Sequence, residues 1–183
     1  MIIKDYQLIN SIDTDLFQSF LIYGPNEGLI RESIDTIYKG FSKGSECEKV
    51  NINGKQLEES ISILNDEITT FSLFSEKKFI ILDLIKEKHV SIIEDVLLLN
   101  CINTCMVVKA DNLIKSSKIR KLYETSKNHF SLACYDDDMK VLSSLLEKFQ
   151  NEHNISFSSD VKSFLLNNLS NDRMVIKNEL EKI

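Results

Sequence analysis

Five short runs rich in β-branched and aromatic residues alternate with segments of helical periodicity through most of the chain. In those segments apolar residues recur every three or four positions, which is the spacing of one helix face. Strand-like runs that alternate with helix-length segments predict an α/β fold, in which a mostly parallel sheet of about five strands is covered by helices on both faces. The predicted strands are residues 19–24, 47–53, 77–83, 104–110 and 130–135.

Two of the intervening segments have clear apolar stripes, and each stripe predicts one helix that docks on the sheet. The first stripe consists of Ile30, Ile34, Ile37 and Phe41. The second follows the strand 47–53 and consists of Leu57, Ile61, Leu64 and Ile68.

The pattern changes at "DDDMK", because no strand-like run follows Tyr135 and three helical segments take its place. Ser158 or Ser159 and then Asn171 are suited to cap the second and third helices. We therefore expect an α/β first domain over residues 1–136 and a small three-helix domain over residues 137–183. The end at Ile183, on an apolar helix face, is expected of a truncated form that lacks a further domain. The expected apolar faces are Leu142, Leu145, Leu146 and Phe149, then Val161, Phe164, Leu165 and Leu169, then Ile176, Leu180 and Ile183.

Composition and charge exclude several classes of protein. Apolar residues make up 43% of the chain and charged residues 27%, as in soluble globular proteins. No apolar stretch reaches membrane-spanning length and residues 1–10 lack a signal peptide's apolar core, so we expect a cytoplasmic protein without membrane contact. The net charge of −6 argues against DNA binding over the whole surface. Any DNA contact is expected to be local or made through partners.

The cysteines and histidines form no recognisable metal or catalytic site. Cys101 and Cys105 are spaced as C-x3-C, but no second pair or histidine follows at ligand spacing. Like the other two cysteines, they lie in or beside apolar segments, where a reduced thiol packs as a small hydrophobe. The histidines are scattered and flanked by charge, which predicts surface positions for His89, His129 and His153. We expect no metal, no cofactor and no catalytic residue.

The stretch "FLIYGPNEGLIRES" has the order of a phosphate-binding loop: an apolar strand, a turn and a helix. Its turn consists of Gly24, Pro25, Asn26, Glu27 and Gly28. A working loop needs lysine and a hydroxyl residue after the last glycine, to neutralise phosphates and hold Mg²⁺. Counted from Gly24, the positions of that last glycine, of the lysine and of the hydroxyl residue carry Leu29, Ile30 and Arg31. We therefore predict a degenerate phosphate loop that turns the chain from strand into helix.

A second part of the nucleotide apparatus is also incomplete. The strand "FIILD" resembles the Mg²⁺-holding strand of ATPases and ends in Asp83, but Leu84 stands where a residue would activate water. Neither ATP hydrolysis nor tight nucleotide binding is expected. Such a chain keeps a nucleotide-type scaffold and is expected to act by contact.

The stretch "TTFSLFSEKKFIILD", residues 69–83, contains an adjacent Leu73 and Phe74 framed by Ser72 and Ser75. If the preceding helix continues, Leu73 points away from its apolar stripe; if the helix ends near Phe71, the pair lies in a turn. An exposed pair of this kind suits a hydrophobic pocket on a partner. The alternative, a pair covered by a neighbouring loop, stays open on these residues alone.

The chain resembles the delta subunit of the bacterial DNA polymerase III clamp loader. The resemblance rests on "LIYGPNEGLIRE", "FSLFSEKKFIILD", "ADNLIKSSKIRKLYE", "ACYDDD" and "RMVIKNELEKI", in that order. It implies an AAA+-like first domain, a three-helix lid domain and a helical collar domain, which we expect to be absent from this chain. It also implies a component of the DNA-directed DNA polymerase (nucleotidyltransferase) holoenzyme that is not itself an ATPase.

The resemblance implies that the chain binds the sliding clamp, or beta subunit, and opens it for loading on primed DNA during replication. In the family an exposed Leu-Phe pair enters a pocket on the clamp, and the matching residues are Leu73 and Phe74, with Ser72 and Ser75 beside them. The implied partners are the gamma/tau motor subunits, delta prime and, through the complex, primer-template DNA.

The segment "KSSKIRKLYETSK" is basic within an acidic chain and is a candidate for DNA or subunit contact. Its candidate residues are Lys115, Lys118, Arg120 and Lys121. A solvated helix face is the alternative. Residues 136–138, three consecutive acids, are better explained as helix capping than as a metal site.

Two other functions are compatible with this kind of fold. A nucleotide-binding AAA+ ATPase would carry the lysine that is missing at Ile30. A delta-prime-like stator of the same complex usually has cysteine-rich metal knuckles and a Ser-Arg-Cys motif, and the sequence shows neither. The "SLFS" segment favours delta.

Overall fold

The computed structural model describes residues 1–13, 16–60, 62–70, 75–99, 101–136, 139–168 and 173–182. These residues form two compact units. The first comprises Met1–Gly24 and Glu32–Ala133, and the second comprises Pro25–Arg31 and Cys134–Ile183. The boundary expected at residue 136 stays a prediction.

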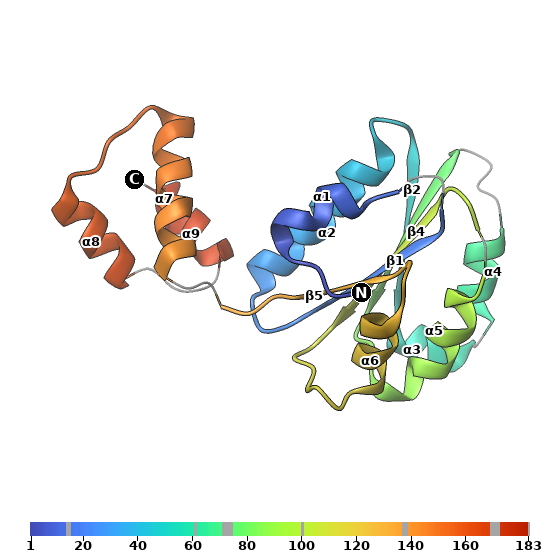
Figure 1. Ribbon diagram of the computed structural model, residues 1–183. Coiled ribbons are helices and arrows are strands. Elements are labelled where there is room, and N and C mark those ends of the chain that lie inside the picture. The colour runs from blue at the N-terminus through green and yellow to red at the C-terminus, as the bar shows by residue number, and fades with distance from the viewer. Residues whose placement is uncertain are drawn as a thin grey trace. The chain divides into compact units, whose positions relative to one another are not determined.

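The first unit is built on a five-stranded sheet in which every neighbouring pair of strands is parallel, as the sequence predicts. The strand order is β2-β3-β4-β1-β5 (Figure 1). Three strands have the predicted bounds, and β1 begins and ends one residue earlier. The strands are β1 (Gln18–Tyr23), β2 (Cys47–Asn53), β3 (Lys77–Asp83), β4 (Thr104–Ala110) and β5 (Phe130–Ala133).

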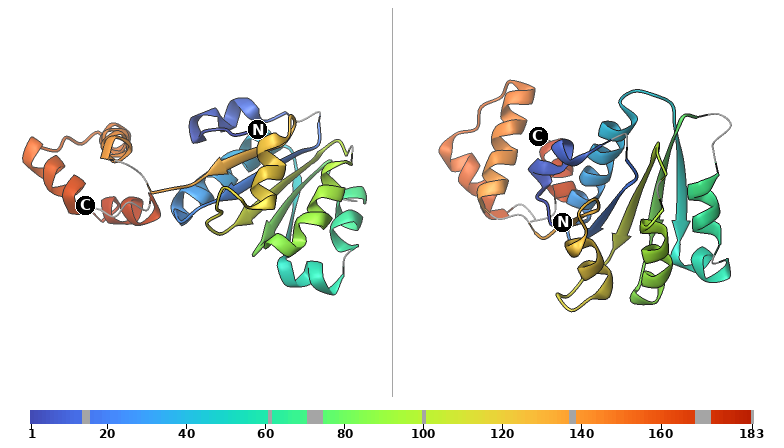
Figure 2. Two further views of the ribbon diagram at one scale, coloured as in Figure 1. Left: turned by 60° about the horizontal axis from the view of Figure 1, so that its bottom comes forward. Right: turned by 45° about the vertical axis from the view of Figure 1, so that its right-hand side comes forward.

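Helices cover both faces of this sheet (Figures 1 and 2). On one face lie α1 (Leu8–Ser11), preceded by η1 (Asp5–Gln7), and α2 (Glu27–Ser42). On the other lie α3 (Gly54–Glu59), α4 (Ile63–Thr69), α5 (Val90–Leu97), preceded by η2 (Glu87–His89), and α6 (Lys118–Thr125). Because side chains alternate along a strand, each strand supplies both faces. The core under α3 to α6 includes Leu21, Ile80, Leu82, Met106 and Val108, which are all fully buried.

The second unit contains three helices after residue 136, as predicted. They are α7 (Met139–His153), α8 (Ser159–Asn168) and α9 (Arg173–Leu180). Their core is formed by Leu142, Leu146, Ile176 and Leu180, which belong to the expected faces of α7 and α9. Ser158 caps α8, since its Oγ accepts a hydrogen bond from the Val161 amide at 3.4 Å. The expected contacts of Leu169, Asn171 and Ile183 lie outside the described residues.

The single helix predicted over residues 57–68 is wrong, because two helices occupy this segment. Asn53 caps α3 by accepting hydrogen bonds from the amides of Lys55 and Gln56, and α3 ends at Glu59. Ser60 is extended at φ −142° and ψ 101°, so the backbone leaves the helix there. Leu57, Leu64 and Ile68 are nevertheless buried, whereas Ile61 lies outside the described residues.

Two further predictions need correction. Val161 and Phe164 of α8 are exposed, and this helix packs through Leu165 and Leu166 instead. Its apolar residues are spread around the axis, so periodicity does not single out one face. The last strand stops at Ala133 and not at residue 135, because the Cys134 carbonyl accepts from the Asn26 amide at 3.1 Å outside the sheet.

The prediction that all three histidines lie at the surface is wrong for His89 and His129, which are buried. The His129 Nδ1 accepts from the Ser19 amide at 3.2 Å, and its Nε2 lies 3.2 Å from the Leu97 carbonyl. His129 therefore carries its proton on Nε2 and connects β1 to the end of α5. These bonds are made to backbone groups distant in sequence, which residue patterns do not reveal.

We predict that the stability of the chain decreases at acidic pH through His129. Burial lowers the pKa of His129, so folding favours the neutral ring. The unfolded chain then binds more protons, and the contribution is present above the unfolded pKa of about 6.5 and lost as the pH falls through the lowered folded value. Urea unfolding from about pH 7.5 to 5.5 should show this decrease, and His129→Gln should remove it. His153→Gln, at an exposed histidine, is the control and should retain the decrease.

Candidate functional site

The two regions singled out in the sequence adjoin opposite ends of the strands along the chain. The degenerate phosphate loop follows the carboxyl end of β1, whereas residues 71–74 precede the start of β3. Since all strands run in one direction, their starts share one edge and their ends share the other. The two regions therefore require separate descriptions.

The degenerate loop is closed by its own hydrogen bonds. Gly24 has φ 139°, a conformation that side chains rarely adopt and that glycine tolerates. The fully buried Asn26 begins α2, because its Oδ1 accepts from the Leu29 amide at 2.9 Å and its carbonyl accepts from the Ile30 amide at 3.0 Å. The amide nitrogen of Asn26 donates to the Cys134 carbonyl.

These bonds occupy groups that a phosphate loop would direct at its ligand. The amides of Asn26, Glu27, Leu29 and Ile30 all donate to protein oxygens. Leu29 and Ile30, at the positions that would carry the lysine and its neighbour, are buried. A phosphate would therefore have to displace internal bonds and would meet apolar side chains.

The second part of the nucleotide apparatus is likewise engaged in internal contacts. The Oδ1 of Asp83 accepts from the Leu84 amide at 2.8 Å and lies 3.9 Å from the Lys109 ammonium. Leu84 is 61% exposed and adopts φ 56°. Its aliphatic side chain has no group that could activate water.

At the other edge, α4 ends at Thr69 and Thr70 is extended. The sequence left open whether this helix continues or ends near Phe71. The helix ends at Thr69, before residue 71. The predicted clamp-binding residues Ser72, Leu73 and Phe74, together with Phe71, lie outside the described residues. Ser75 is half-buried, and β3 begins at Lys77.

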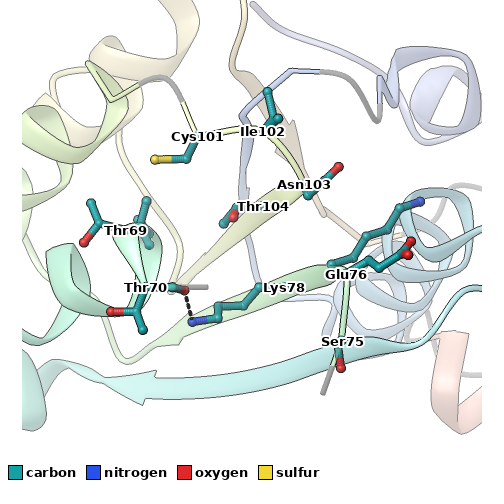
Figure 3. Close-up of a pocket in the computed structure, with 11 residues that line it drawn as sticks. Thr69, Thr70, Ser75, Glu76, Lys78, Cys101, Ile102, Asn103 and Thr104 are labelled. Carbon is teal, nitrogen blue, oxygen red and sulfur yellow. Dashed lines mark hydrogen bonds between the residues drawn. The ribbon is translucent and has the colours of Figure 1, made fainter. Parts of the chain in front are cut away.

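Both flanks of residues 71–74 line one cavity of about 160 Å³ (Figure 3). One flank contributes Ile68, Thr69 and Thr70, and the other contributes residues 75–78. The third wall is the approach to β4, residues 101–104. The cavity thus lies between the end of α4, the start of β3 and the residues that precede β4.

Lys78 is a buried cation at this point, and the sequence analysis did not single it out. Its ammonium donates to the Glu67 carbonyl at 2.8 Å and to the Thr70 carbonyl at 2.9 Å, and it lies 3.2 Å from the Glu67 carboxylate. Figure 3 shows the side chain extending toward Thr70. The last carbonyls of a helix lack intrahelical partners, so a cation there stabilises the helix end.

Lys77 plays the same part on the opposite face of the sheet. Its ammonium donates to the Phe41 carbonyl at 2.7 Å and to the Ser42 carbonyl at 3.3 Å, at the end of α2. Adjacent residues of a strand point to opposite faces, so neighbouring lysines reach helices on the two sides. The signal available in the sequence was "KK" at the start of an otherwise apolar strand.

The basic segment divides into two kinds of residue. Lys115, Lys118 and Lys121 are exposed and remain candidates for contact with DNA or another subunit. Arg120 is mostly buried and holds the fold together: its Nε donates to Glu124 at 2.7 Å and its Nη1 to the Leu113 carbonyl at 3.2 Å. Its guanidinium also lies 5.2 Å from the centre of the Tyr23 ring.

Within the described ranges, no group of three or more His, Cys, Asp or Glu side chains is placed to hold a metal ion. No helix in the described part of the chain is long and apolar enough to span a membrane. The cysteines are free thiols, and burial raises the pKa of Cys105, which favours its protonated form.

Two solved structures are similar to this chain in fold. The Bacillus subtilis DNA clamp loader delta protein (YqeN) is similar with a TM-score of 0.61 at 15% identity, over 97% of this chain and 55% of that one. The ORC2 protein of Aeropyrum pernix in its ADP form gives a TM-score of 0.43 at 12% identity, over 80% of this chain and 49% of that one. The chain thus spans about half the length of these proteins.

The fold is that of an α/β protein similar to a clamp loader subunit. A family model described as "DNA polymerase III, delta subunit" matches residues 20–128, more than half of the chain. The chain belongs to this family of DNA polymerase III delta subunits. Family and fold together support a clamp-loader component. A search of the curated proteins finds no match.

We predict that Asn26→Ala lowers the free energy of unfolding by about 1–2 kcal/mol, because it removes the cap of α2. Asn26→Ser, which keeps an oxygen acceptor, should recover part of the loss. Urea unfolding of the three proteins measures the effect. A change below about 0.5 kcal/mol for Asn26→Ala, the scale of ordinary surface substitutions, would contradict the role given to this side chain.

Proposed function

We propose that this chain is the clamp-binding part of a delta subunit: it binds the sliding clamp and opens it for loading on primed DNA, without hydrolysing ATP itself. The observation that carries the proposal is the family match, which includes the segment between α4 and β3. Leu73 and Phe74 are the proposed anchors in a clamp pocket, and Ser72 and Ser75 lie at the edge of the contact.

Opening a ring by contact requires only differential binding. A ligand shifts a conformational equilibrium by the difference between its affinities for the two states. If the chain binds the open clamp more tightly than the closed clamp, it holds the open form without a chemical step. The internally bonded loop and the buried Leu29 and Ile30 support a subunit of this kind.

The remaining partners follow from the family and belong to the proposal. They are the gamma/tau motor subunits, delta prime and primer-template DNA reached through the complex, all within the DNA-directed DNA polymerase holoenzyme. Lys115, Lys118 and Lys121 are the exposed cations available for such contacts. A cytoplasmic location stays a prediction.

The alternative functions receive less support. An ATPase would have to bind phosphate where amides already donate to Asn26 and Pro25 oxygens. A delta-prime-like stator is disfavoured by the match to the delta family.

We predict that Leu73→Ala with Phe74→Ala weakens binding to a bacterial sliding clamp by about tenfold or more, equivalent to about 1.4 kcal/mol. Removing two anchors from a partner's pocket eliminates most of the apolar contact at the centre of an interface. Titration calorimetry or surface plasmon resonance with both chains fully folded provides the measurement.

The matched control for this pair is Leu84→Ala with Phe164→Ala. These residues are 61% and 65% exposed, and they lie at the carboxyl end of β3 and on α8. Clamp affinity should remain within about twofold, since most interface energy comes from few anchors. Clamp binding that survives loss of Leu73 and Phe74 would move the site elsewhere. Absence of binding by the wild type would reject the proposed function.

We predict that MgATP leaves the melting temperature unchanged. A ligand present at a hundred times its dissociation constant would stabilise the chain by about 2.7 kcal/mol, which shifts the melting temperature by several degrees. Differential scanning fluorimetry with millimolar MgATP, with a P-loop ATPase as positive control, tests this. A reproducible upward shift would favour the ATPase alternative.

A further inference from the structure

Lys78 is buried, all three of its ammonium donors have oxygen partners, and it lies close in sequence to the proposed clamp contact. An ammonium group has three donors, and three oxygens lie within 3.2 Å of this one. Removing an ammonium from water is costly unless partners compensate. The three oxygen partners therefore compensate for the loss of water around the buried Lys78 ammonium.

The partners of Lys78 all come from the end of α4. Two are the carbonyls of Glu67 and Thr70, and the third is the Glu67 carboxylate. Lys78 itself is fixed to the sheet, because its amide donates to the Asn103 carbonyl at 2.9 Å. One side chain thus joins the residue before Phe71 to the strand that follows Ser75.

We propose that Lys78 is a positioning residue for clamp binding, whose ammonium holds the two flanks of residues 71–74 together and so presents Leu73 and Phe74 to the clamp. The inference rests on the proposed function. Closing the chain between Thr70 and Lys78 reduces the conformations open to the intervening residues. A contact made from a restricted segment loses less entropy on binding, which increases affinity without any new contact.

Lys77 provides an internal control for the substitution of Lys78. It is the adjacent residue, carries the same charge and also caps a helix, but it binds the carbonyls of Phe41 and Ser42 at the end of α2. Lys77→Met and Lys78→Met therefore remove the same group and the same kind of bond. Only the second releases Thr70.

The test compares clamp affinity and unfolding free energy for both variants in the 183-residue chain. Lys78→Met should weaken binding to a bacterial sliding clamp by about tenfold, whereas Lys77→Met should change it by less than about twofold, with both variants more than 95% folded. A merely structural role would reduce stability and leave the affinity of the folded protein unchanged. Equal clamp affinities for the two variants overturn the inference.

A double-mutant cycle adds a readout specific to positioning. In the background of Leu73→Ala with Phe74→Ala, Lys78→Met should have no further effect on clamp affinity, because the groups that it positions are gone. Additive effects would overturn the inference and make Lys78 an independent contact. Should Lys78→Met not fold, Glu67→Ala replaces it: it removes the carboxylate, one of the three partners of the ammonium, so affinity should fall in the same direction, and unchanged affinity overturns the inference.

The failure of this inference differs from that of the proposed function. If the wild type does not bind the clamp, the proposed function fails and this inference fails with it. If the wild type binds through Leu73 and Phe74 while Lys78→Met binds equally well, the function stands and only the positioning role is lost.

Discussion

Two ammonium groups at the start of β3 fasten helices to both faces of the sheet. Lys77 binds the last carbonyls of α2, and Lys78 binds those of α4. A helix end without a partner for these carbonyls would fray or need water. Because the two lysines are adjacent on one strand, the ends of both helices are set by the register of that strand. The geometry at this edge of the sheet depends on these contacts.

The turn after β1 has the order of a phosphate-binding loop, but its backbone groups bind other protein groups. There Asn26 caps α2 and donates its amide to the Cys134 carbonyl, so that the turn is held by protein groups in place of a phosphate. Buried Leu29 and Ile30 complete an apolar environment. The amides of this turn are thus engaged within the protein, and residues 71–74, which are proposed for clamp contact, precede β3 in the sequence.

The sheet could be predicted closely because β1, β3 and β4 are mostly buried and read as apolar runs, whereas the half-exposed β2 was marked by its β-branched residues; β2, β3 and β4 have the predicted bounds. Periodicity failed where local bonds decide, as at Ser60, where the expected helix divides in two. It also failed for His129, whose burial depends on backbone groups of Ser19 and Leu97. Lys78 was missed for a related reason: "KK" at the start of an apolar strand marks two cations, but it does not reveal the carbonyls that they will contact.

Under the proposed function, in which the chain holds the clamp open, the rigidity of the residues that flank the binding segment affects how well it can do so. A binding segment on a flexible hinge can bind its partner. It transmits little force, because the hinge changes conformation and the partner does not. A segment whose flanks are bonded to a sheet shares the rigidity of that sheet. Tighter binding to the open ring than to the closed ring then requires two conditions. The anchor residues must fit the ring, and the part of the protein that carries them must be rigid. Leu73 and Phe74 are proposed for the first, and the Lys78 contacts with Glu67 and Thr70 supply a physical basis for the second.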